Sequence, residues 1–160
     1  MERTTPRHRV RVCNLQRRFR VNARSIATLC SCVLDAMGEG ASALNVVVVN
    51  PGLMRALNRR FRGRDYATDV LSFAYGQAAS DDVRDLGEVI VSPEAASLQA
   101  GRWRTSSEAE VKRLIVHGML HLLGYDHEAD SGEMMECQRR LLRRRAVAHC
   151  GPVFLGVARS

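Results

Sequence analysis

The sequence predicts one α+β domain over residues 1–160, with a mixed sheet of about four strands packed on helices. Three observations lead to this fold class. The chain has 160 residues, the size of one domain with an ordinary hydrophobic core. Strand patterns are short and few, and helical patterns gather late in the chain. Such an order of elements favours one sheet covered by helices.

Four strands are predicted, each from a short run that alternates in polarity or is rich in β-branched residues. These runs are Arg9–Asn14, Leu44–Val49, Thr68–Phe73 and Leu86–Val91. Gly63–Asp65 is predicted to be a turn, and the small, polar segment 76–85 is predicted to be a loop. The pattern leaves the order of the strands in the sheet open.

Five helices are predicted where apolar residues recur at helical spacing. They cover 21–37, Pro51 to about Arg60, Pro93 to about Ala100, Ser107 to Gly124, and the segment after Asp130. Asn50 and Ser92 each precede a proline, which is the order of an N-cap and a first-turn proline. Two further starts have the spacing of a capping box, namely Ser107 with Glu110 and Asp130 with Glu133.

The charge of the chain favours anionic partners. Its net charge is +7, and Lys112 is the single lysine among 24 basic residues. Arginine contacts phosphate through two parallel hydrogen bonds, so this composition is compatible with nucleic acid binding. A bias of the whole sequence toward arginine explains the charge equally well. Charge alone therefore does not identify a partner.

The remaining composition indicates a cytoplasmic protein without a membrane partner. The apolar runs are all shorter than the roughly 20 residues that cross a bilayer, and the basic first residues are not followed by an apolar signal-peptide core. The chain has five cysteines, and their spacing lacks the C-x-x-C pattern of zinc or redox sites. We interpret them as ordinary thiols in a reducing compartment.

Three histidines predict one metal site. His117 and His121 lie four residues apart on an expected helix, so both imidazoles lie on one face, a turn apart. Gly124 can end the helix in the left-handed conformation and turn the chain back, which lets His127 reach the same ion. Three nitrogen ligands leave one position for water, as in catalytic zinc sites. Zn²⁺ is expected, with nickel and copper left open by ligand type.

The residue after the first histidine limits the chemistry. The spacing matches the H-E-x-x-H-x-x-G-x-x-H pattern of metzincin proteases, but Gly118 stands where those enzymes have their general-base glutamate. The metal geometry is therefore expected without the peptidase base. A histidine on an apolar helix can also be an ordinary core residue, but three unpaired imidazoles in such a segment would cost free energy.

A second cluster concentrates arginines in the segment 56–65, just before the third strand. These arginines could hold phosphate groups, with Phe61 as an anchor or a stacking surface. A solvated turn is the simpler interpretation of the same composition.

Together these segments resemble the YbeY family of ribosomal RNA maturation factors. The resemblance rests on three blocks: the histidine segment His117–His127, the run from Leu57 through Asn58, Phe61, Arg62 and Asp65 to Thr68–Phe73, and Leu86–Val89. The blocks extend from about residue 50 to residue 127. Two residues depart from the common pattern, because Glu88 replaces an aspartate and Ala74 replaces a proline.

The resemblance implies a metal-dependent endoribonuclease that is specific for single strands. Family members act in ribosomal RNA maturation, notably at the small-subunit 3′ end, and in ribosome quality control. The implied partners are ribosomal RNA, the ribosome and ribosome-associated proteins. The implied metal ligands are His117, His121 and His127, and the family's functional arginine falls on Arg62.

The corresponding hypothesis is metal-assisted phosphodiester hydrolysis, in which Arg62 holds the phosphate. The base is left open between a zinc-bound hydroxide and the RNA 2′-hydroxyl. Asp126 could orient an imidazole or cap the turn before His127. Two rival functions are another zinc hydrolase, such as a peptidase, and a non-catalytic ribosome biogenesis factor with structural zinc. The second rival needs a fourth ligand, for which Cys137 is the nearest cysteine in sequence.

Overall fold

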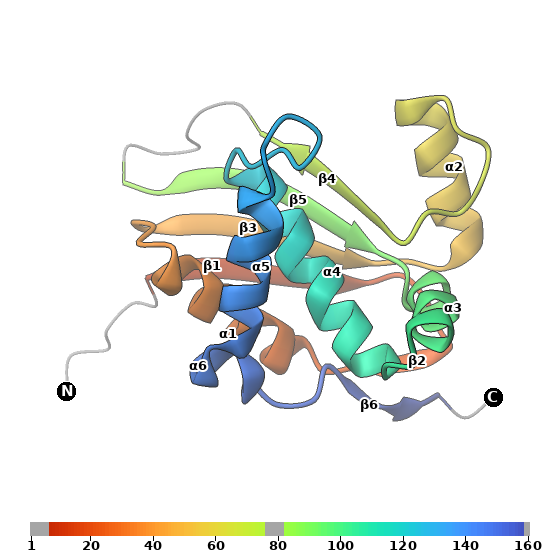
Figure 1. Ribbon diagram of the computed structural model, residues 1–160. Coiled ribbons are helices and arrows are strands. Elements are labelled where there is room, and N and C mark those ends of the chain that lie inside the picture. The colour runs from red at the N-terminus through yellow and green to blue at the C-terminus, as the bar shows by residue number, and fades with distance from the viewer. Residues whose placement is uncertain (1–6, 76–81, 159–160) are drawn as a thin grey trace.

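The computed structural model describes residues 7–75 and 82–158. Its elements follow in the order β1 (His8–Asn14), β2 (Phe19–Val21), α1 (Ala23–Ala36), β3 (Ser42–Val48), α2 (Pro51–Arg62), β4 (Val70–Ala74), β5 (Arg84–Val91), α3 (Pro93–Trp103), α4 (Ser107–Leu122), α5 (Glu133–Arg143), α6 (Arg145–Ala148) and β6 (Phe154–Val157). Figure 1 shows α1, α4 and α5 together beside the twisted sheet and α2 apart from them.

The main sheet has four strands in the order β1-β3-β5-β4. The pairs β1–β3 and β3–β5 are parallel, and β4 runs antiparallel along β5 at the edge. The predicted α+β fold with a four-stranded mixed sheet is therefore confirmed. β2 and β6 form a separate antiparallel pair, which the sequence did not predict because each is only a few residues long and pairs across most of the chain.

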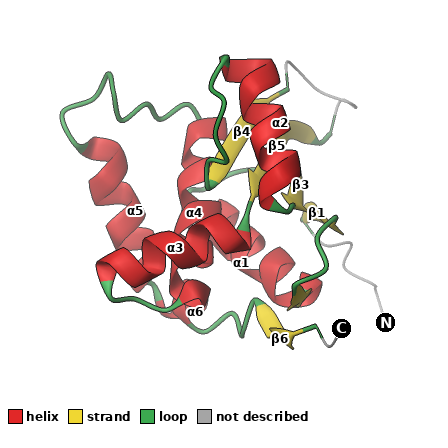
Figure 2. Cartoon of the chain, turned by 90° about the vertical axis from the view of Figure 1, so that its right-hand side faces the viewer, coloured by secondary structure: helices red, strands yellow, loops and turns green. Residues whose placement is uncertain are grey.

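Both faces of the sheet are covered. On one face α1, α4 and α5 form the larger core with alternate strand residues such as Val46 and Val89. On the other face α2 packs through Met54 against Leu71 and Ile90. Figure 2, turned by 90°, shows α2 apart from α1, α4 and α5. Because residues alternate along β4, its Leu71 side belongs to α2 and its neighbouring residues face α4.

Several predicted helix ends are confirmed and others are corrected. The Asn50 side chain accepts a hydrogen bond from the Leu53 amide at 2.9 Å, and α2 ends at Gly63 with φ of 67°. For α4 the N-cap is Ser106 rather than Ser107, and its hydroxyl accepts from the Ala109 amide at 3.0 Å. The predicted capping box is wrong because the Glu110 carboxylate pairs with Arg113 instead.

Two other starts differ from the prediction. Ser92 makes no side-chain capping bond at the start of α3, so only its proline neighbour acts as expected. At α5 the N-cap is Gly132, while the Asp130 carboxylate accepts from the Gly132 and Met134 amides at 2.8 Å each. Asp130 therefore supports the helix start from two residues before the cap. Helix α6 is a single turn and had no pattern of its own.

The strand ends also shift. β4 begins at Val70 instead of Thr68, which leaves Thr68 and Asp69 in the connection before the strand. β5 begins at Arg84, inside the segment that was predicted to be a loop. Residues 76–81 of that segment lie outside the described residues. Among the helices that the structure describes, none is long and apolar enough to cross a membrane.

Candidate metal centre and cleft

The three predicted histidines converge at the end of α4. His117 and His121 project from successive turns, and a Schellman motif follows, in which the Tyr125 amide donates to the Leu120 carbonyl at 3.0 Å. Gly124 has φ of 95°, which a side chain would strain. This sharp reversal brings His127 back, and one nitrogen from each of the three rings lies within 4.8 Å of the others.

Hydrogen bonds fix the two helical imidazoles. His117 Nδ1 lies 2.9 Å from Gln138 Oε1, and His121 Nδ1 lies 3.0 Å from the Tyr125 carbonyl oxygen. Both partners are acceptors, so each Nδ1 carries the proton and each Nε2 presents a lone pair. The buried Gln138 was missed by sequence reasoning, since it comes from α5 and no local pattern links it to α4.

The Nε2 lone pairs of His117 and His121 point toward the same space. His117 Nε2 and His121 Nε2 are 3.2 Å apart, and two acceptors cannot share a hydrogen bond at that distance. A tetrahedral zinc ion with bonds of about 2.0–2.1 Å would separate two ligand nitrogens by roughly 3.3 Å. The donor set and its spacing therefore fit a metal ion.

Burial keeps these rings neutral. It lowers the pKa of His117 and of His121 from the ordinary value, and the neighbouring His127 lowers the pKa of His121 further. Arg62 also contributes to the lowered pKa of His121, so the guanidinium is close enough to act on the ring. A neutral imidazole is the form that binds a metal.

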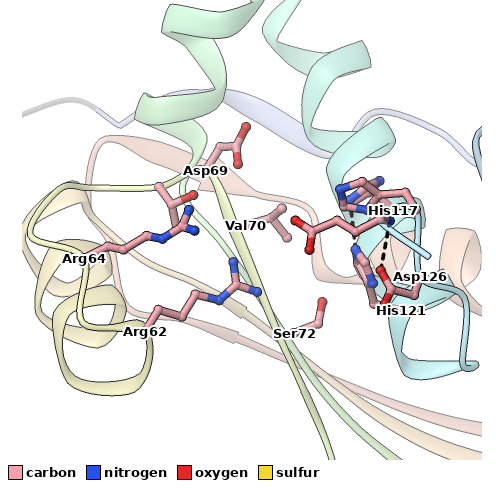
Figure 3. A pocket seen from close by; sticks show the side chains of 11 residues that line it. Arg62, Arg64, Asp69, Val70, Ser72, His117, His121 and Asp126 are labelled. Carbon is pink, nitrogen blue, oxygen red and sulfur yellow. Dashed lines mark hydrogen bonds between the residues drawn. The ribbon is translucent and has the colours of Figure 1, made fainter.

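Arg62 lies in the opposite wall of a cleft of about 510 Å³ that the three histidines share. The end of α2 carries it, and Arg64 follows in the next turn. Figure 3 shows both guanidinium groups pointing across the cleft toward His117 and His121. Arg62 is exposed and makes no ion pair among the residues that the structure describes. Its donors are thus free for an anionic ligand.

The loop that follows Arg62 is held in place by hydrogen bonds to α2. Buried Asn58 donates through Nδ2 to the Tyr66 carbonyl oxygen at 2.9 Å. Arg55 makes two hydrogen bonds to the Asp65 carboxylate, at 2.8 and 2.9 Å, and this contact lowers the pKa of Asp65. The predicted turn at Gly63–Asp65 therefore has fixed ends, with Arg62 just before it.

Phe61 is an anchor that also keeps an exposed face. Its ring meets the edge of Phe73 on β4, with 5.1 Å between centroids, and the Arg60 guanidinium lies 5.4 Å from the Phe61 centroid. The remaining 56 % of Phe61 is exposed. The arginine cluster is therefore more than a solvated turn, because its aromatic residue ties α2 to the edge strand.

Gly118 lets α4 approach the sheet closely. A Cβ atom at this position would lie 2.7 Å from Val89 Cγ1 and 2.9 Å from Ser72 Oγ. The Ser72 hydroxyl donates to the Gly118 carbonyl oxygen at 3.1 Å. No side chain fits here without a shift of the neighbours, so the position that holds the metzincin base is closed on steric grounds as well.

Two remaining expectations concern Asp126 and Cys137. The Asp126 carboxylate accepts from the Glu128 amide at 3.0 Å, which is the turn-capping role. Cys137 is buried against Met37, with 3.7 Å between the sulfur atoms. It does not belong to the group of possible ligands, which within the described part of the chain consists of the three histidines.

Fold and site together define an α+β domain in which three histidines that could hold a metal ion share a cleft with Arg62 and Arg64. The family model described as Endoribonuclease YbeY matches residues 11–146. The chain therefore belongs to the YbeY family, and the resemblance seen in the sequence is confirmed.

Individual relatives support this assignment. An endoribonuclease YbeY of Anaeromyxobacter sp. (strain Fw109-5) is 38 % identical over 136 residues, which cover 84 % of this chain and 70 % of the relative. That of Pelotomaculum thermopropionicum is 41 % identical over 118 residues, 71 % and 74 % of the two chains. The solution structure of TM1509 from Thermotoga maritima aligns with a TM-score of 0.58 at 28 % identity, covering 83 % of this chain and 86 % of that one.

Proposed function

We propose that this protein is a zinc-dependent endoribonuclease specific for single-stranded RNA, acting in ribosomal RNA processing at the small-subunit 3′ end and in ribosome quality control. The observation that carries the proposal is the placement of Arg62 across one cleft from His117, His121 and His127. Residues 1–160 would act as one domain. Family membership supports an RNA substrate, and the net charge of +7 favours it electrostatically.

The metal ligands in this proposal are the Nε2 atoms of His117 and His121 and one ring nitrogen of His127. Zinc, when bound, would supply a water of lowered pKa or a Lewis acid for a phosphoryl oxygen. Gln138 and the Tyr125 carbonyl hold the first two rings in the ligating tautomer.

Arg62 would bind the scissile phosphate. A guanidinium can donate two parallel hydrogen bonds to phosphate oxygens and stabilise the negative charge that develops in the transition state. Arg64 lines the same cleft and can hold an adjacent phosphate, although its Nη1 also lies 3.4 Å from the Tyr66 hydroxyl. The attacking group would be either a water activated by the zinc, when bound, or the RNA 2′-hydroxyl.

The direct test is cleavage of an unstructured RNA by the zinc-loaded wild type, Arg62→Ala and Arg59→Ala. Arg59 is exposed on the same helix and does not line the cleft, so it is the matched control. We expect Arg62→Ala to lose cleavage by about 100- to 1,000-fold, as when one charge-stabilising donor is removed, and Arg59→Ala to retain it. Equal cleavage by all three proteins contradicts the proposal.

A peptidase function is the first rival and has a distinct signature. It needs a base other than residue 118, whose side-chain space is filled by Val89 and Ser72. Turnover of a peptide panel without cleavage of RNA would establish it.

A purely structural zinc is the second rival. It requires a fourth protein ligand, and His117, His121 and His127 are the full group found among the described residues. Unfolding on zinc removal, together with ribosome binding that survives in a histidine variant, would establish it.

Action in the cytoplasm with ribosomal RNA, the ribosome and ribosome-associated proteins is part of our proposal. Co-sedimentation of the wild type with ribosomal subunits tests that part.

A further inference from the structure

Two further hollows continue from the metal cleft toward α3. One has a volume of about 400 Å³, shares Thr68 and Asp69 with the cleft, and is also lined by Tyr66, Leu98 and Arg102. The next, of about 260 Å³, shares Ala67, Ala95 and Leu98 with it and ends at Phe19 and Arg18. We call the surface formed by Tyr66, Ala67, Leu98 and Arg102 the side groove. It adjoins the cleft at Thr68 and Asp69, in the connection before β4.

Tyr66 stands at the junction of the cleft and the side groove. Its carbonyl oxygen is held by buried Asn58, and its hydroxyl lies 3.4 Å from Arg64 Nη1 in the cleft wall. Yet 50 % of Tyr66 is exposed. A single exposed aromatic residue is common on protein surfaces, but this one is fixed at two points and lies on the route out of the cleft.

The charges along this route favour a polyanion. Arg102 is exposed in the last turn of α3 and makes no ion pair among the described residues. Arg62 and Arg64 lie at the cleft end. Of the carboxylates along the route, Glu94 is paired with Arg18 at 3.5 Å, and Asp69 lines both the cleft and the first hollow. Asp126 and Glu128 line the cleft at its histidine end. Arginines that flank an exposed aromatic ring form the usual binding surface for single-stranded nucleic acid.

We propose that the side groove holds nucleotides beyond the two that the scissile phosphate joins, with a base stacked on Tyr66 and a phosphate bound by Arg102. Leu98, which is 72 % exposed, offers the next apolar surface along the strand. This inference rests on the proposed nuclease function and describes how the same site grips its substrate. The expected ligand is single-stranded RNA, because the side groove adjoins the cleft and an RNA strand bound at Arg62 must extend beyond the cleft on an open surface.

The test compares a long and a minimal substrate on the zinc-loaded protein. The long substrate is an unstructured RNA of about 12 nucleotides, within the range of single-strand binding sites, and the minimal one is a dinucleotide. Tyr66→Ala should raise KM for the long RNA by at least about fivefold, the weak end of stacking by one base, with kcat unchanged. KM for the dinucleotide should not change. Tyr66→Phe keeps the ring and should keep the wild-type KM.

Arg102→Ala gives a second, independent readout. It should raise KM for the long RNA. It should also reduce the slope of log Kd against log salt concentration by about the amount that one phosphate contact contributes. The matched controls are Tyr75→Ala and Arg139→Ala, an exposed tyrosine and an exposed arginine that do not line either hollow. Both should bind and cleave as the wild type does. Melting temperatures verify that each variant is folded.

Wild-type KM in Tyr66→Ala on the long RNA, or an equal rise on both substrates, overturns the side-groove proposal while the nuclease proposal stands. If the wild type cleaves no RNA, the nuclease proposal fails, and fluorescence anisotropy of the labelled long RNA decides the side groove by itself. A fivefold weaker Kd for Tyr66→Ala then supports it, and equal Kd values overturn it.

Discussion

The two walls of the cleft, the histidine wall on α4 and the arginine wall at the end of α2, differ in how firmly their side chains are held. On the α4 side, His117 and His121 donate hydrogen bonds to Gln138 Oε1 and to the Tyr125 carbonyl oxygen, which hold the two rings, and burial lowers the pKa of both histidines. On the α2 side, the Arg62 guanidinium is exposed and has no fixed partner among the described residues. A metal needs ligands placed to within a few tenths of an ångström, whereas a phosphate can be gripped by a side chain that adjusts.

The histidine side of the cleft should therefore be more sensitive than the arginine side to changes in the residues that position its functional groups. The largest expected effect is that of His121→Ala. Loss of one ligand nitrogen should reduce bound zinc from one ion per chain to almost none. RNA cleavage should fall by about 1,000-fold, because metal catalysis supplies several kcal/mol. Metal analysis of the purified variant and single-turnover kinetics check this. A variant that keeps its zinc and its rate would show that His121 is not a ligand.

The second largest effect is expected from Gln138, which orients the His117 ring. Gln138→Ala removes the acceptor of the His117 Nδ1 proton, so the ring is free to rotate. We expect zinc affinity to fall by about 10- to 100-fold, as measured by competition with a chromogenic chelator. Gln138→Glu keeps an acceptor and should bind zinc more tightly than the alanine variant does. An unchanged affinity in Gln138→Ala would mean that the glutamine does not orient the ring.

A third change tests how tightly α4 must lie on the sheet. Gly118→Ala forces a methyl group against Val89 and Ser72, so we expect the free energy of unfolding to fall by about 1–3 kcal/mol. Urea titration of the zinc-loaded protein measures it. Gly101→Ala is the control, because it lies in helix α3 with open space at its Cβ position and should be neutral or slightly stabilising. Equal stabilities of the two variants would contradict the steric argument.

The smallest expected effect lies in the arginine wall. Asn50→Ala removes the N-cap at the start of α2, at the opposite end of the helix from Arg62. The free energy of unfolding should fall by about 1 kcal/mol, and kcat on RNA should stay at the wild-type value. A large drop in kcat would show that this wall is as finely positioned as the histidine wall. Thermal unfolding and steady-state cleavage together decide.

Much of the site follows from local sequence. The i, i+4 spacing of His117 and His121 places both rings on one face of any helix, and a glycine at position 124 permits the left-handed turn that returns His127. Asn50 and Pro51 likewise define the start of α2 through contacts within one turn. Such features were predictable because their energetics involve residues a few positions apart.

The exact ends of helices and strands were harder to predict where neighbouring residues favoured them equally. Ser106 and Ser107 are both good caps, and the choice fell on Ser106 because Glu110 is engaged by Arg113 rather than by the helix start. The end of the loop before β5 was also misplaced, since Arg84 and Asp85 join the sheet by pairing with β3. In both cases a partner elsewhere in space decided between local alternatives.

The sequence by itself determined the class of fold, the three converging histidines and the family motif. Only the tertiary structure decided the strand order, the pairing of His117 with Gln138 21 positions along the chain, and the placement of Arg62 across the cleft from the three histidines. The physical reason is that these contacts depend on how β4 and α4 pack, with Gly118 against Ser72, and packing is a property of the whole core.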